Sequence, residues 1–147
     1  MSEQDNDSWK ILIDTNLMAL CIATKEVIAH MREKKINGQI ININSVAGHY
    51  IPSMEKPIMG IYPASKHAVT AATEQFRQEM VYLGTDIKIT SLSPGYVYTD
   101  IHKDGGDTTN PNGMDPEDVV DGVMFILSTK PNILVKELTL KHIREKF

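Results

Sequence analysis

The sequence predicts an α/β protein built on a parallel sheet. Three observations support this prediction: helix-like and strand-like segments alternate along the chain, the strand-like segments are short and rich in β-branched residues, and turn-forming residues bound them. Alternation of this kind places successive strands parallel, with a right-handed crossover through the helix between them. A length of 147 residues leaves room for one domain.

The first predicted helix runs from Ser8 to about Lys34, and we expect it to be well buried. Its apolar residues recur at helical spacings: Ile11, Leu12, Leu17, Leu20, Ile22, Val27, Ile28 and Met31. Asn37-Gly38 is expected to end it, because this pair is a turn signal. The segment Gln39–Asn44 then predicts a short strand, with Ser45 at its carboxyl end.

A second helix is predicted from Ile61 to Leu83, where helical spacing of apolar residues resumes and Gly84 is placed to stop it. The segment between, Val46–Met59, is predicted to be a loop. Ile87–Leu92 predicts the second strand, and Pro94-Gly95 breaks it.

A third helix is predicted from Pro116 to about Ser128, since Asp115 precedes a proline and the first turn is acidic. The glycine- and aspartate-rich segment Tyr96–Met114 is predicted to be a loop. Val135–Lys141 alternates weakly and is predicted to form a last strand.

Composition and charge exclude several classes of function. The formal net charge of −4 offers no basic stripe, so a nucleic-acid partner is not expected. No apolar stretch is long enough to cross a membrane, and the polar, acidic start does not resemble a secretory signal, so we expect a cytoplasmic protein. Cys21 is alone and is expected to be a small core residue. No metal site is expected, because the histidines lack partners at ligand spacing: His30, His49, His67, His102 and His142.

Candidate chemistry lies where strands end, because ligands of open parallel sheets bind at the carboxyl ends of the strands. Ser45 and Pro94-Gly95 occupy such positions. Tyr62 and Lys66 are four residues apart on the following helix and share one face. A nearby ammonium would lower the pKa of the phenol from about 10, so that Tyr62 could act as a general acid or base. Ser45 could hold the same substrate oxygen.

Each of these residues also has an ordinary structural interpretation. The Tyr62–Lys66 pair could be an exposed helix face, Ser45 and Pro94-Gly95 could be turn residues, and Asn16 could be a polar residue on a helix. Their order along the chain favours the functional interpretation, since all of them then surround one pocket.

Three segments, Asn42–Gly48, Tyr62–Lys66 and Ser93–Thr99, resemble successive motifs of the short-chain dehydrogenase/reductase family. Asp14-Thr15-Asn16 resembles the helix motif of that family. The run ending at His49 and the Lys136–Leu140 finish are most similar to NADP-dependent reductases of the insect farnesol dehydrogenase-like group.

The resemblance implies a catalytic set and a cofactor, NADP or NAD. Tyr62 would be the acid/base, Lys66 would also bind the nicotinamide ribose, and Ser45 would orient the substrate. The backbone of Asn16 would hold a water that links Lys66 to solvent. The nicotinamide end of the cofactor would contact a further segment, at Pro94, Gly95, Val97 and Thr99.

The sequence departs from the family in one respect. Neither the T-G-x-x-x-G-x-G turn that holds the pyrophosphate nor the N-N-A-G motif is found. We therefore expect the C-terminal part of a Rossmann-type doubly wound parallel sheet, with the first mononucleotide-binding half missing and cofactor binding impaired. An exposed sheet edge and an uncovered apolar helix face would follow.

Two functions remain open from the sequence. The first is hydride transfer between NADP(H) and a small apolar alcohol or carbonyl compound, since six residues could line an apolar pocket: Met54, Ile58, Met59, Tyr96, Ile101 and Met114. The second is an inactive chain that acts at most as an interaction module. In either case the resemblance implies a homo-oligomer formed through the two long helices.

Overall fold

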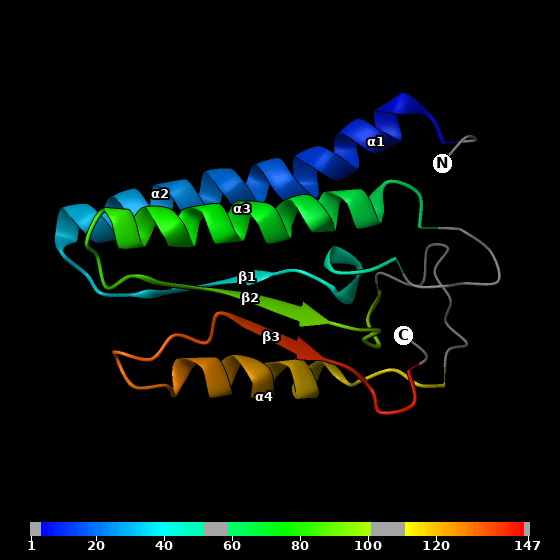
Figure 1. Ribbon diagram of the computed structural model, residues 1–147. Helices are drawn as coiled ribbons and strands as arrows, with labels where there is room; N and C mark the ends of the chain where they lie inside the picture. The colour runs from blue at the N-terminus through cyan, green and yellow to red at the C-terminus, as the bar shows by residue number, and fades with distance from the viewer. Residues whose placement is uncertain (1–3, 52–58, 101–110, 146–147) are drawn as a thin grey trace.

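The structure is a computed structural model that describes residues 4–51, 59–100 and 111–145 (Figure 1). A long helical run opens the chain and comprises α1 (Asn6–Ile13), a π-helical segment (Asp14–Met18) and α2 (Ala19–Lys34). The remaining elements follow in the order β1 (Gln39–Ile43), a 3-10 turn (Val46–Gly48), α3 (Tyr62–Tyr82), β2 (Lys88–Pro94), α4 (Pro116–Leu127) and β3 (Glu137–Leu140).

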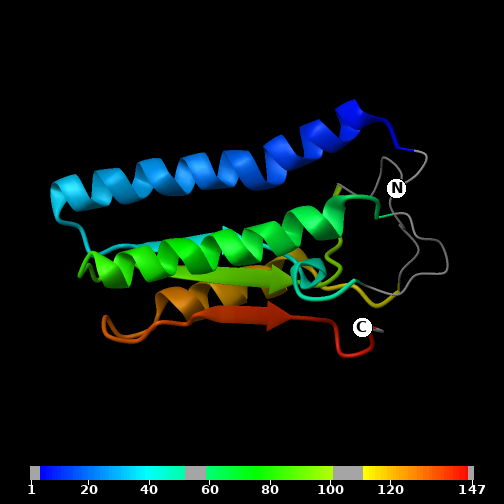
Figure 2. The ribbon, with the colours of Figure 1, turned by 45° about the horizontal axis from the view of Figure 1, so that its top comes forward.

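The strands form a parallel sheet in the order β1-β2-β3. Helices α1, α2 and α3 cover one face of the sheet, and α4 lies on the other, as Figures 1 and 2 show. The predicted α/β class with parallel strands is therefore confirmed. Parts of the two predicted loops, residues 52–58 and 101–110, lie outside the described residues.

The first helix ends at Lys34, where it was predicted to end, but its stop signal is not the predicted one. Lys35 adopts a left-handed conformation with φ of 55° and donates its backbone N–H to Arg32 O, while Ile36 N–H donates to Met31 O at 2.8 Å. These bonds satisfy carbonyls that the last helical turn leaves free, so the left-handed Lys35 stops the helix, and not Asn37-Gly38.

The layer between the sheet and helices α2 and α3 changes character along the strands. Near the strand starts it is an apolar cluster, formed by the buried residues Ile28, Met80, Ile87 and Ile89. Towards the carboxyl ends it becomes polar: Thr24 donates to Asn42 Oδ1 at 3.2 Å, and Asn42 Nδ2 donates to Thr73 Oγ1 at 3.1 Å. Because buried polar atoms need partners, this layer also fixes how the helices sit on the sheet.

The other face of the sheet is closed by α4. Asp115 and Asp118 form a capping box at the start of this helix, and Asp115 N–H donates to Asp118 Oδ2 at 2.9 Å. Gly122 allows close packing on β3, because a Cβ at this position would lie 2.6 Å from Leu140 Cδ1. The predicted helix start is confirmed.

The expectation that the first helix is well buried is wrong. Only Thr24 and Ile28 are buried in α2 and none of the α1 residues is, while Ile11 is 67% and Ile22 is 56% exposed. The expected uncovered apolar helix face is therefore confirmed, and β1 lies at an edge of the described sheet.

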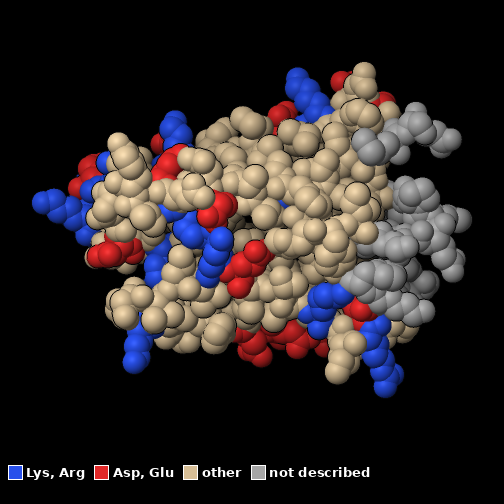
Figure 3. Space-filling model, viewed as in Figure 1, with Lys and Arg blue, Asp and Glu red and all other residues tan. Residues whose placement is uncertain are grey.

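Two further features concern the surface charge and the helices. On the face shown in Figure 3, Lys and Arg side chains are interspersed with Asp and Glu and form no continuous basic stripe. Among the helices described, none combines the length and the apolar character of a membrane-crossing segment.

Candidate active site at the carboxyl ends of the strands

Ser45 follows β1 and begins a tight turn. Its side chain accepts a hydrogen bond from Ala47 N–H at 3.1 Å, and its backbone oxygen accepts one from Gly48 N–H at 2.9 Å. Asn44 N–H donates to Leu92 O at 2.7 Å, so the chain is still attached to β2 immediately before the turn. Ser45 is thus buried at the carboxyl end of the sheet, as predicted.

Tyr62 and Lys66 stand on the first turn of α3 and face the end of β1. Lys66 Nζ donates to Ile43 O at 3.2 Å and lies 5.8 Å from the centre of the Tyr62 ring. The Ser45 side chain lies close enough to the Tyr62 phenol to lower its pKa. The structure therefore brings Ser45, Tyr62 and Lys66 together.

The electrostatics of this group differ from the prediction. Burial raises the pKa of the Tyr62 phenol above its ordinary value, and the hydrogen bond from Ser45 opposes part of that rise. Burial also lowers the pKa of Lys66. The net shift of the Tyr62 pKa is therefore upward, because desolvation of the phenol is the largest effect.

Asn16 lies in the middle of the π-helical segment, where Ala19 N–H bonds to Asp14 O five residues earlier. Such wide turns leave the regular helical hydrogen-bond series and are frequent at functional sites. Asn16 Nδ2 donates to Ser65 Oγ at 3.1 Å, and Ser65 Oγ donates to Tyr62 O at 2.7 Å. Asn16 therefore joins the site through the backbone of Tyr62.

Ser65 was missed from the sequence. It is fully buried and links the first helical run to α3, although it stands inside the Tyr62–Lys66 motif. A small polar residue between two candidate catalytic residues was the only signal that could have identified it.

The segment after β2 is arranged around a bridge between Val97 and Met114. Tyr98 N–H donates to Met114 O, and Met114 N–H donates to Tyr96 O, both at 2.9 Å. Pro94 is buried and Thr99 is exposed. The N–H and C=O of Val97 have no hydrogen-bond partner among the described residues.

A second unpredicted contact lies beside Gly95, which donates its N–H to Leu140 O at 2.8 Å. Glu145 Oε1 accepts from Tyr96 N–H at 3.2 Å, and a Cβ on Gly95 would lie 2.7 Å from that oxygen. Burial raises the pKa of Glu145, against lowering contributions from Tyr96 N–H and Lys141. A carboxylate distant in the sequence thus anchors the start of the Tyr96–Thr99 segment.

The structure describes only some of the residues predicted to line an apolar pocket. Met54, Ile58 and Ile101 lie outside the described residues. Met114, which forms the bridge with Val97, is buried, and the ring of Tyr96 packs edge-on against Tyr98, with 5.7 Å between ring centres.

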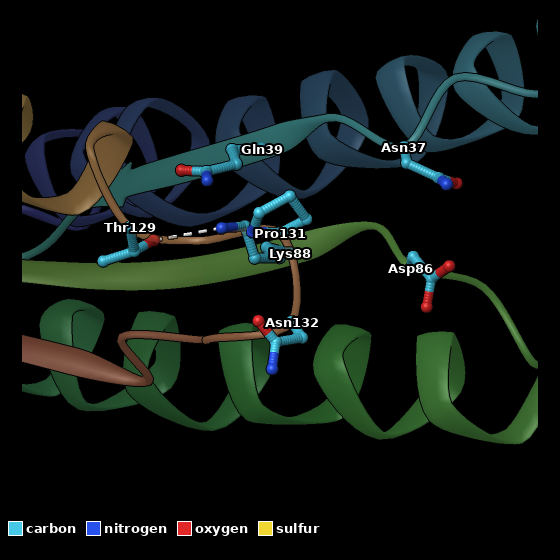
Figure 4. Close-up of a pocket in the computed structure, with 7 residues that line it drawn as sticks. All are labelled: Asn37, Gln39, Asp86, Lys88, Thr129, Pro131 and Asn132. Atoms are coloured by element: carbon cyan, nitrogen blue, oxygen red, sulfur yellow. Dashed lines mark hydrogen bonds between the residues drawn. The ribbon is translucent and has the colours of Figure 1, made fainter.

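A hollow of about 300 Å³ lies at the opposite end of the sheet, near the strand starts (Figure 4). Lys88 in its wall donates to Thr129 Oγ1, Lys130 O and Ile133 O at 3.0–3.2 Å. These bonds use all three ammonium hydrogens, so Lys88 holds the loop after α4 in place. In the part of the chain that is described, no three His, Cys, Asp or Glu side chains gather as metal ligands.

Known proteins resemble this chain in both sequence and fold. The family model for short chain dehydrogenase matches residues 1–110. Farnesol dehydrogenase of Aedes aegypti is 40% identical over 136 residues, which cover 92% of this chain and 55% of that protein. Dehydrogenase/reductase SDR family member 11 of Mus musculus is 38% identical over 143 residues, covering 90% of this chain and 54% of that protein.

Solved structures of dehydrogenases also resemble this chain in fold. The closed form of serine dehydrogenase complexed with NADP+ has a TM-score of 0.83 at 25% identity, covering 99% of this chain and 60% of that one. The structure of 4-hydroxyisoleucine dehydrogenase complexed with NADH has a TM-score of 0.77 at 29% identity, covering 97% and 61%. The chain spans about half the length of the curated relatives that it matches. On these similarities, and with its strand-end serine, tyrosine and lysine, the chain belongs to the short-chain dehydrogenase family.

Proposed function

We propose that this chain carries the proton-transfer part of an oxidoreductase that moves hydride between NADP(H) and a small apolar alcohol or carbonyl compound. The observation that carries the proposal is the grouping of Ser45, Tyr62 and Lys66 at the carboxyl end of the sheet. Relatives whose names are farnesol dehydrogenase and dehydrogenase/reductase support the same class of reaction.

The residues present fit the nicotinamide end of such a cofactor. A carboxamide carries both a donor and an acceptor, and Val97 offers a backbone N–H and C=O that are free of partners among the described residues. Pro94, Gly95 and the exposed Thr99 complete this segment. The bound cofactor would supply or accept the hydride. NADP is proposed over NAD because the farnesol dehydrogenase-like motifs favour it, although solved relatives bind either cofactor.

Lys66 would hold the ribose of that cofactor. One of its three ammonium hydrogens is donated to Ile43 O, which leaves two for ribose hydroxyls. Ser45 would bind the substrate oxygen beside Tyr62 and orient it, since a neutral hydroxyl can donate without giving up its proton. Asn16 would support the site by holding Ser65, which contacts the backbone of Tyr62.

Tyr62 would act as the general acid in carbonyl reduction. Its raised pKa keeps the phenol protonated at neutral pH, so the proton is available to an oxygen that gains negative charge. Alcohol oxidation would need the phenolate, which burial disfavours. The protonated phenol is the form that carbonyl reduction uses.

The test is hydride transfer by the purified protein, followed as NADPH absorbance with a panel of apolar ketones, aldehydes and alcohols. We expect turnover that falls by about 10²–10⁴-fold in Tyr62→Phe, the usual contribution of a general acid. Tyr82→Phe is the matched control, because Tyr82 lies at the far end of the same helix and is 89% exposed. Turnover that persists in Tyr62→Phe would contradict the assignment.

A binding module without turnover is the second candidate, favoured by exposed apolar residues on the first helical run, among them Ile11, Ile22 and Val27. Absence of both NADPH binding and turnover would favour it. In either case we propose that this helix face is a homo-oligomer contact. Ile22→Glu should then lower the mass found by light scattering, and an unchanged mass would exclude this face.

A further inference from the structure

Hydrogen bonds connect the turn that carries Ser45 to His49. Ala47 and Gly48 donate their N–H groups to Ser45, and His49 N–H donates to Val46 O at 3.0 Å. These short-range bonds close the 3-10 turn between the two residues. The backbone positions of Ser45 and His49 are therefore linked through this turn.

One side of this turn is held by α3. Thr70 Oγ1 donates to Gly48 O at 2.9 Å and accepts from Asn44 Nδ2 at 2.8 Å. Thr70 stands one helical turn after Lys66, and a Cβ on Gly48 would lie 2.8 Å from Lys66 O. The turn is thus packed tightly on the helix that carries the proposed catalytic pair.

The opposite side is held by the His49 side chain, which reaches β2 and β3. His49 Nε2 lies 2.6 Å from Glu137 Oε1 and 3.0 Å from Ser93 Oγ. His49 and Glu137 are exposed as whole residues, but their side chains are only 26% and 33% exposed. Ser93 is fully buried and directly precedes Pro94. The imidazole therefore connects the Ser45 turn with the strand that leads into the proposed cofactor segment.

The same three residues do not form a hydrolytic triad. A triad needs the carboxylate on one ring nitrogen and the serine on the other. Here both Ser93 and Glu137 contact Nε2, and Ser93 is out of reach of any substrate. The arrangement joins structural elements and has no nucleophile to activate.

We propose that His49 and Glu137 are positioning residues that set the distance between the Ser45 turn and the Pro94–Thr99 segment. The inference rests on the proposed function, in which Ser45 holds the substrate and Pro94–Thr99 contacts the cofactor. Hydride transfer needs the two reactants at a fixed separation, and a displacement of about 1 Å can cost about 10²-fold in rate.

The experiment compares His49→Phe with His49→Gln in the purified protein. Phe keeps the ring but has no N–H, whereas the Gln amide places a donor near the position of Nε2. In His49→Phe we expect kcat to fall by about 10–100-fold while the Kd for NADPH stays within about twofold. His49→Gln should recover most of kcat. His30→Phe, at an exposed position on α2, is the matched control.

Hydrogen exchange of the Gly48 and His49 amides separates the two proposals, because it needs no turnover. We expect faster exchange at both amides in His49→Phe and Glu137→Leu, and none of this change in His49→Gln or His30→Phe. If the unaltered protein shows no turnover, the proposed function fails, and the exchange rates alone decide whether the contact holds the turn.

Two outcomes would overturn the positioning role. One is unchanged exchange and unchanged kcat in His49→Phe. The other is a loss of NADPH affinity in proportion to kcat with a lowered Tm, since that pattern would come from general destabilisation.

Discussion

Lys66 Nζ lies 5.8 Å from the centre of the Tyr62 ring and is hydrogen-bonded to Ile43 O at 3.2 Å. The ammonium thus connects the end of β1 to the first turn of α3. Burial of the phenol is the largest effect on Tyr62, and the pKa of Tyr62 is raised. The titration of Tyr62 is therefore a sensitive measure of the site.

Removing the Ser45 hydroxyl should raise the pKa of Tyr62 further. The hydrogen bond from Ser45 is the contribution that lowers this pKa, so Ser45→Ala leaves only the effect of burial. The ring carbon shift of Tyr62 in NMR, assigned by its loss in Tyr62→Phe, measures the midpoint. The same variant should lose about 10²–10³-fold in kcat, as expected for one oxyanion-stabilising donor. A lower titration midpoint for Tyr62 in Ser45→Ala would show that Tyr62 donates the hydrogen bond and Ser45 accepts it.

Protein stability at high pH should depend on Tyr62. Its folded-state pKa lies above the ordinary value of 10.0, so the folded state keeps a proton that the unfolded chain releases. This contribution is complete below pH 10 and is lost as pH rises through the folded-state pKa. Urea unfolding from pH 8 to 11 should show a steeper loss of stability in the unaltered protein than in Tyr62→Phe. Parallel curves would contradict the raised pKa.

Thr73→Val should destabilise the fold by about 1–3 kcal/mol, the cost of leaving a buried donor without a partner. The substitution preserves shape but removes the acceptor of Asn42 Nδ2. Thr139→Val on β3 is the control, because Thr139 is exposed. Equal unfolding midpoints for the two variants would show that the polar layer contributes nothing at this position.

Gly122→Ala should have two opposing effects on the free energy of unfolding. Alanine in a helix interior gains about 1 kcal/mol over glycine, whereas overpacking costs about 1–3 kcal/mol. The new Cβ would lie 2.6 Å from Leu140 Cδ1 and 3.4 Å from Leu138 Cδ2. We expect a net loss of about 1 kcal/mol in denaturant unfolding, because α4 must move away from β3. A gain would show that the leucine side chains can rotate away.

The features that the sequence determined by itself depend on residues close together along the chain. The alternation of elements, the capping box at Asp115 and the positions of Ser45, Tyr62 and Lys66 depend on short-range patterns. Parallel strands place their carboxyl ends at one edge, so residues that follow strands were expected at one site. Family motifs added the cofactor segment from Pro94 to Thr99.

Only the tertiary structure decided which of these residues touch and how they titrate. The contacts of Ser65 with Asn16, of Glu145 with Tyr96 and of Glu137 with His49 join residues 49 to 88 positions apart, so no local sequence pattern predicts them. The pKa of Tyr62 likewise follows from desolvation by packed neighbours. Sequence spacing puts an ammonium near a phenol, but burial determines which effect on the phenol is larger.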